Sequence, residues 1–122
     1  MPTKLLIRNV NRQTELAHSA DMANTSEKRR TGLLKHTQLP AGEGLWIVPC
    51  EAVHTFGMNF PIDVLYLNKE KKVLKIRDNM KKSRMSFCLR AHSVLELPAG
   101  HAAATGTQTG DQLEFIKRVE ND

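Results

Sequence analysis

Short segments rich in apolar residues, separated by polar turns, recur along most of the chain, which is typical of β-strands. The best strand candidate is "IDVLYL" at residues 62–67, which a polar loop, "NKEKK", joins to the returning segment "VLKIR". The pattern predicts strands at residues 4–10, 15–20, 45–48, 62–67, 73–77, 93–98 and 112–117. Short turns separate most of these segments, so we expect hairpins rather than long crossover connections.

The spacing of apolar residues becomes that of a helix once, after residue 24. Asn24 is a good N-cap residue and Glu27 follows three positions later, which is the arrangement of a capping box. The pattern predicts a helix through "TSEKRRTGLLKH" (25–36), with Leu33 and Leu34 facing inward. Gly32 within this helix costs about 1 kcal/mol relative to alanine, which indicates a close approach to another backbone. A shorter helical turn is expected in "AGHAAATG".

These elements predict an α+β fold. We expect a compact, mainly antiparallel or mixed β-sheet, curved into a small barrel, with one main helix packed on it. The length of 122 residues suits a single domain spanning residues 1–122, monomeric by default. The chain has no signal peptide and no apolar run near the ~20 residues of a membrane helix. We therefore expect a cytoplasmic protein with no membrane contact, unless a leader has been removed.

Positive charge is concentrated in one window. The whole chain carries a net charge of +5, whereas residues 69–90 hold nine basic side chains against two acidic ones. An anionic partner is therefore expected there, and nucleic acid is one candidate. Only Phe87 supplies an aromatic ring within the window, so the stacking that single-stranded nucleic acid needs is weakly represented. The candidate anion-binding residues are Lys75, Arg77, Lys81, Lys82 and Arg84.

"CEAVHTFGM" places Cys50, His54 and Met58 four residues apart. On a helix this spacing would bring a thiol, an imidazole and a thioether to about 6 Å, close enough for a soft metal or a nucleophile–base pair. On a strand the same residues are ~13 Å apart. Flanking prolines and β-branched residues favour an extended segment, so we expect no metal, although Cys50 or His54 could still meet a distant group.

Two carboxylates stand within apolar strands. Asp63 shares a strand face with Leu65, and Glu96 lies between Leu95 and Leu97. A buried carboxylate requires a partner, and two that lie close together can shift the pKa of one and support acid–base chemistry. The simpler interpretation is structural, with Arg29 or backbone N–H groups satisfying each carboxylate.

Five motifs in order resemble a known family of conserved bacterial and archaeal proteins, domain of unknown function 192. They are "RRTGLL" (29–34), "GEGLWIVP" (42–49), "HTFGMNFPIDVLYL" (54–67), "VLELPAG" (94–100) and "TGD" (109–111). The resemblance covers about residues 5–117. Many members carry Trp before the methionine, where this chain has Gly57. The resemblance implies a compact, barrel-like α+β domain and no established activity, substrate or cofactor.

The sequence therefore favours a small binding or accessory domain over an enzyme. We expect a shallow polar pocket near the His54–Asp63 segment, an unknown small ligand or protein partner, and no cofactor. The candidate ligand-binding residues are Arg29, His54, Met58, Asp63 and Glu96. One alternative is an acid–base or hydrolytic enzyme that uses Asp63 or Glu96 with His54 or Cys50. The other is anion or nucleic-acid binding through residues 69–90.

Overall fold

One seven-stranded mixed sheet forms the body of the molecule. The computed structural model describes residues 3–34 and 36–119. The strand order is β6-β5-β8-β3-β2-β1-β9, and every neighbouring pair is antiparallel except the parallel pair β2–β3. The strands are β1 (Thr3–Asn9), β2 (Thr14–Ala23), β3 (Glu43–Ile47), β5 (Ile62–Leu67), β6 (Val73–Met80), β8 (Ser93–Pro98) and β9 (Leu113–Val119).

All seven predicted strand segments fall on these strands, and two further strands were missed. β4 (Ala52–His54) and β7 (Met85–Phe87) pair antiparallel as a separate two-stranded sheet. Each has only three residues, too few for an alternating pattern to stand out. The prediction that residues 50–58 avoid a helix is confirmed, because β4 lies within them.

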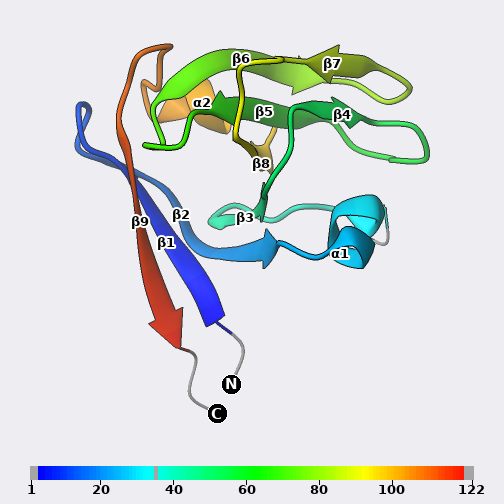
Figure 1. The fold of residues 1–122 in the computed structure, drawn as a ribbon, viewed down its shortest axis with the longest axis horizontal. Helices are drawn as coiled ribbons and strands as arrows, with labels where there is room; N and C mark the ends of the chain where they lie inside the picture. Colours follow the sequence, from blue (N-terminus) through cyan, green and yellow to red (C-terminus); the bar gives the residue numbers. More distant parts are fainter. Residues whose placement is uncertain (1–2, 35, 120–122) are drawn as a thin grey trace.

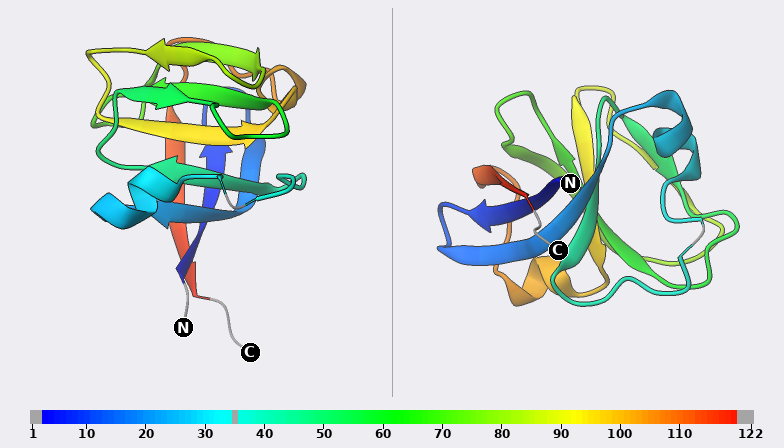
Figure 2. Two further views of the ribbon diagram at one scale, coloured as in Figure 1. Left: turned by 90° about the vertical axis from the view of Figure 1, so that its right-hand side faces the viewer. Right: turned by 90° about the horizontal axis from the view of Figure 1, so that it is seen from below.

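The sheet is strongly curved but does not close into the predicted barrel. Figures 1 and 2 show β1 and β9 running across the direction of β3, β5 and β8. The two edge strands meet only where they begin, at a bridge between Lys72 and Gln112, with the Leu113 amide donating to the Lys71 carbonyl. Beyond that point β9 follows β1 along its whole length, which carries it away from β6.

The predicted main helix is much shorter than expected. α1 spans Ser26–Thr31, and its N-cap is Thr25, whose side chain accepts from the Lys28 amide, rather than Asn24. Gly32 ends the helix with a φ of 49° and a ψ of −128°, a conformation that side-chain-bearing residues rarely adopt. Leu33 is buried as predicted, whereas Leu34 is 43% exposed because it lies beyond the helix. The predicted helical turn is confirmed as α2 (His101–Ala104).

The sheet buries apolar side chains on both faces. One face packs Ile7, Leu16, Leu65 and other residues into the hollow of the curve. The other face carries a second cluster that includes Val64, Tyr66 and Val94. Strand β5 is buried at all six positions because it is covered on both sides. Successive residues of β5 and β8 therefore belong to different cores, which decides where their two carboxylates point.

Candidate functional site

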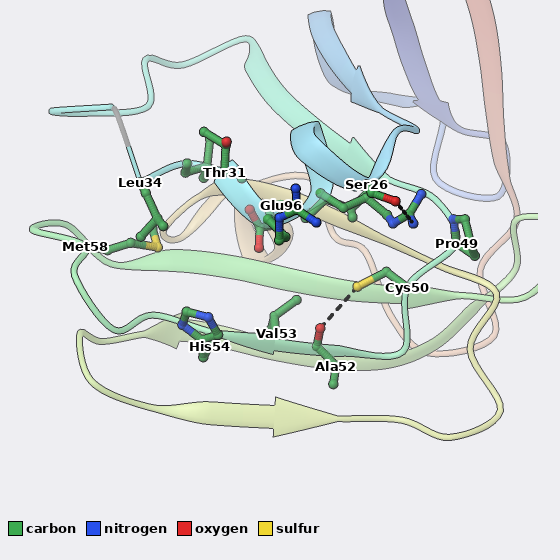
Figure 3. Close-up of a pocket in the computed structure, with 15 residues that line it drawn as sticks. Ser26, Thr31, Leu34, Pro49, Cys50, Ala52, Val53, His54, Met58 and Glu96 are labelled. Carbon is green, nitrogen blue, oxygen red and sulfur yellow. Dashed lines mark hydrogen bonds between the residues drawn. The ribbon is translucent and has the colours of Figure 1, made fainter.

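A pocket of about 360 Å³ opens between α1 and β4 (Figure 3). Its walls come from α1 and the residues after it, from the segment following β3, and from β4. Its apolar lining includes Leu33, Ile47 and Val53. Five of the residues singled out from the sequence also line it, namely Arg29, Cys50, His54, Met58 and Glu96.

Glu96 is the buried acid of this pocket. It is paired across the sheet with Leu45 and Val64, and both of these residues belong to the second core cluster. The side chain is only 4% exposed, and burial raises its pKa from 4.5 to about 7. None of the hydrogen bonds and ion pairs found in the described part of the chain involves its carboxylate. A buried acid without a protein partner is costly, so its carboxylate is left for a ligand or a proton.

Asp63 lies on the other face of the sheet and does not reach the pocket. It is paired with Leu97, a member of the first core cluster, whereas its neighbour Val64 is paired with Glu96. Its carboxylate accepts three backbone N–H groups, from Asn79 at 2.8 Å, Gly100 at 3.1 Å and Ala102 at 2.8 Å. These bonds tie α2 and the end of β6 to β5. The structural interpretation of Asp63 is thus supported, and no Asp63–Glu96 pair is formed.

The surroundings of Cys50 favour the thiol over the thiolate. Its Sγ donates to the Ala52 carbonyl at 3.1 Å (Figure 3). Burial raises the pKa of the thiol, and the nearby Glu96 raises it further, while the Ala52 contact and Arg29 act in the other direction. Reactive cysteines have a lowered pKa, so the predicted pairing of Cys50 with a base lacks support here.

The His54 side chain lies at the end of β4, where it lines the pocket and contacts its near neighbour Phe56. Its ring stacks on Phe56, with the ring centres 5.2 Å apart and the planes at 25°. Met58, by contrast, is buried, at 5% exposure, and forms part of the pocket wall. Among the described residues no three of His, Cys, Asp and Glu gather closely enough to hold a metal ion.

Arg29 places a guanidinium beside the pocket. Its Nη2 donates to the Ser26 hydroxyl over a long 3.4 Å, and its charge lowers the pKa of Cys50. The ion pairs of the described residues join Lys4 to Asp21 and Arg12 to Asp111, so Arg29 does not neutralise Glu96. The sequence interpretation missed Arg30, which also lines the pocket; its position beside Arg29 in "RRTGLL" was the available signal.

The candidate anion-binding residues divide into two groups. Lys75 and Arg77 are half-buried on β6, and the Lys75 ammonium donates to the Phe87 carbonyl at 2.8 Å. Lys81, Lys82 and Arg84 are exposed in the loop between β6 and β7. The structure therefore leaves the second group more accessible to an anion than the first.

Asp111, in the turn that precedes β9, organises a buried polar cluster. Its carboxylate accepts from Asn9, from Arg12 and from the Gln108 amide. Burial alone would raise the pKa of Asp111, but these hydrogen bonds and the Arg12 charge lower it overall. This cluster stabilises the start of β9 and lies apart from the pocket.

A second hollow, of about 590 Å³, lies against α1 and β2. It is larger than the first, but among the described residues that line it no buried charged group lacks a partner. Asp21 within it pairs with Lys4, and Glu27 and Lys28 are exposed. The chemistry of a specific site is therefore concentrated in the pocket that contains Glu96.

The chain belongs to the DUF192 family, described as "Uncharacterized ACR", whose pattern matches residues 7–115. No curated protein sequence matches it. No helix in the described residues is long and apolar enough to cross a membrane.

Two crystal structures share the fold. One is a protein of unknown function from Novosphingobium aromaticivorans DSM 12444, with a TM-score of 0.78, 21% identity, and coverage of 91% of this chain and 83% of that chain. The other, from Sinorhizobium meliloti 1021, is described as a "putative transcription regulator", with a TM-score of 0.81, 21% identity, and coverage of 93% and 92%. At this identity the likeness establishes the fold alone.

Proposed function

We propose that this chain is a binding domain for a small molecule that has an apolar body and an anionic head such as a carboxylate. The observation that carries the proposal is Glu96, a buried acid in a pocket of about 360 Å³ whose carboxylate has no hydrogen bond or ion pair with the described residues. Pockets of this size with apolar walls and few polar groups are typical of small-molecule sites.

The charges around the pocket favour an anion. Arg29 and Arg30 both line it, so the pocket is net positive whether or not Glu96 is ionised. Near pH 7 a large share of Glu96 is protonated and can donate a hydrogen bond to the head of the ligand. A guanidinium and a carboxylic acid together can then hold one carboxylate, while Leu33 and Val53 contact the apolar body.

Nuclear magnetic resonance titration of the whole chain tests this proposal. We expect short-chain and aromatic carboxylates to shift the amide signals of Gly32 and Val53, while the matched amides and primary amines do not. Arg29→Gln should weaken binding at least tenfold, whereas Lys117→Gln, an exposed change on β9, should not. Equal binding of amines and carboxylates, or carboxylates that leave the pocket signals unmoved, would show the proposal to be wrong.

The affinity should also depend on pH. Because the donating form of Glu96 is the protonated one, carboxylate binding should weaken as the pH rises through about 7. Well above that value the loss should approach tenfold per pH unit. Glu96→Gln keeps a hydrogen-bond donor without the titration, so its affinity should stay nearly constant between pH 6 and pH 8.5. A native affinity that is flat over this range would contradict the role given to Glu96.

A further inference from the structure

The two-stranded sheet exposes an unusual concentration of large apolar side chains. Phe56, Met85, Phe87 and Leu89 are 46%, 69%, 61% and 73% exposed. Residues of this kind are normally scattered singly over a surface, and a cluster of them indicates an interaction site. All four belong to β7 or to the residues that immediately follow β4 or β7.

The strand register brings three rings to this sheet. Phe87 is paired with Ala52 and Met85 with His54, so all four side chains share the exposed face, while Val53 and Ser86 face inward and are buried. The His54 ring in turn stacks on Phe56. The register therefore places Phe87 on the same face as His54 and its neighbour Phe56, although about thirty residues separate them in the chain. A sequence window around Phe87 alone misses the other two rings.

Positive charge borders the same face. Thr55, which is fully buried, donates to the Lys81 carbonyl at 2.6 Å and accepts from the Arg84 amide at 2.9 Å. These bonds fix the loop 81–84 beside the end of β4, with the side chains of Lys81, Lys82 and Arg84 exposed. Arg90 is exposed beyond β7, and the exposed acids on the adjoining segments are Glu51 and Asp78.

We propose that this face, formed by His54, Phe56, Met85 and Phe87 with the loop 81–84, binds single-stranded nucleic acid. Unpaired bases stack on exposed rings, and cations beside the rings neutralise the phosphates of the same strand. An acidic peptide or an anionic lipid surface would match the charge but would not need the rings. The proposal differs from the one made for the pocket, because this face and the pocket share His54, whereas Phe56, Met85, Phe87 and the loop 81–84 do not line the pocket.

Fluorescence anisotropy with the whole chain provides the test. The probes are labelled 20-nucleotide oligo(dT) and oligo(rU), a duplex of equal length, and vesicles containing anionic lipid. We expect the single strands to bind at 50 mM salt, with the duplex at least tenfold weaker. Neutralising about three phosphates predicts a loss of roughly 20-fold in affinity between 50 and 200 mM salt.

Substitutions separate stacking from charge. Phe87→Ala and Phe56→Ala should each weaken single-strand binding about tenfold, the effect typical of losing one stacked base. The double charge reversal Lys81→Glu with Lys82→Glu should abolish binding at 50 mM salt. Ile116→Ala and Lys117→Glu, matched changes on β9, should leave binding unchanged. Circular dichroism must show that each variant remains folded.

Three results would overturn the proposal. The first is the absence of oligonucleotide binding at 50 mM salt. The second is single-strand affinity that Phe56→Ala and Phe87→Ala leave unaltered, since the rings would then have no part in it. The third is binding to anionic vesicles that is tighter than to oligonucleotides and depends on Leu89, which would assign the face to lipid instead.

Discussion

Glu96 and Asp63 are both carboxylates in strands that are mostly apolar and buried, yet their surroundings are opposite. Asp63 receives three backbone hydrogen bonds, whereas Glu96 has burial alone and a pKa raised to about 7. A carboxylate held by three donors stabilises the fold, and one held by none costs stability when it is ionised. The two residues therefore call for different experiments.

The burial of Glu96 makes stability fall as the pH rises. Below pH 4.5 the Glu96 carboxyl is protonated in both the folded and the unfolded chain, so its burial does not change the free energy of unfolding with pH. Between pH 4.5 and about 7 only the unfolded chain releases the proton, which favours unfolding. Above that range the folded chain bears the full cost of burying the ionised Glu96 carboxylate. A pKa difference of this size corresponds to about 3 kcal/mol of unfolding free energy.

Replacing Glu96 should remove this dependence. We expect Glu96→Gln to gain about 3 kcal/mol of unfolding free energy relative to the native chain between pH 4 and pH 8. Urea denaturation at several pH values measures the difference, and Glu114→Gln, an exposed change, is the control. Parallel stability curves for the native chain and Glu96→Gln would show that burial does not perturb this acid.

Asp63→Asn should destabilise the fold. The amide offers a single acceptor oxygen, and its NH₂ group would face the Gly100 or Ala102 amide, donor against donor. The expected loss of unfolding free energy is about 2–3 kcal/mol, with faster hydrogen exchange at those two amides. Asp78→Asn, an exposed change in the same region of the chain, should change stability by less than about 0.5 kcal/mol.

At the level of elements, the longer strands were predictable and the pocket was not. Segments such as 62–67 and 93–98 coincide with β5 and β8 because apolar residues fill most of their positions and turn residues lie on either side. The predicted helix was too long at its C-terminal end, because Gly32 is the C-cap of α1 rather than an interior glycine. Whether Asp63 and Glu96 share a face depends on the β5–β8 register, and a slip of one residue would reverse the answer. The sequence of one strand alone does not show its register against the neighbouring strand.

Thr55 links the two-stranded sheet to the basic loop through its backbone, which bonds Ser83 and Arg84, and through its hydroxyl. Thr55→Val tests the contribution of the hydroxyl. The substitution keeps the shape but removes the bonds to the Lys81 carbonyl and the Arg84 amide. We expect a loss of about 1–2 kcal/mol and faster hydrogen exchange at the Arg84 amide. Thr37→Val, in an exposed loop, is the matched control. Unchanged exchange at Arg84 would mean that the loop is held by other contacts.

For the whole molecule, the central feature is a curved sheet with a core on each face. The hollow of the curve holds one core, and the pocket lies on the other side, where α1 and the β4–β7 sheet cover the second core. Long-range pairing joins the parts, since β1 and β9 run side by side from Thr3–Val119 to Asn9–Leu113. The predicted class is confirmed only in its coarser form, as a mostly β, mixed-sheet fold with two short helices.

Because the sheet stays open, β9 keeps one long edge that no strand of the described residues covers beyond its first contact with β6. Such an edge is a template on which a second molecule can add a strand. Its charged residues Glu114, Lys117 and Arg118 are exposed, and charges on an edge oppose that pairing.

Solubility at high concentration therefore depends on these few side chains. Replacing Glu114 and Lys117 together by valine should produce self-association in sedimentation experiments, whereas Lys28→Val and Glu27→Val on α1 should not. If the β9 variant sediments as the native chain does, the charges are not what keeps neighbouring copies apart. The gap that leaves the barrel open is thus also the place where one molecule could be extended into a fibre.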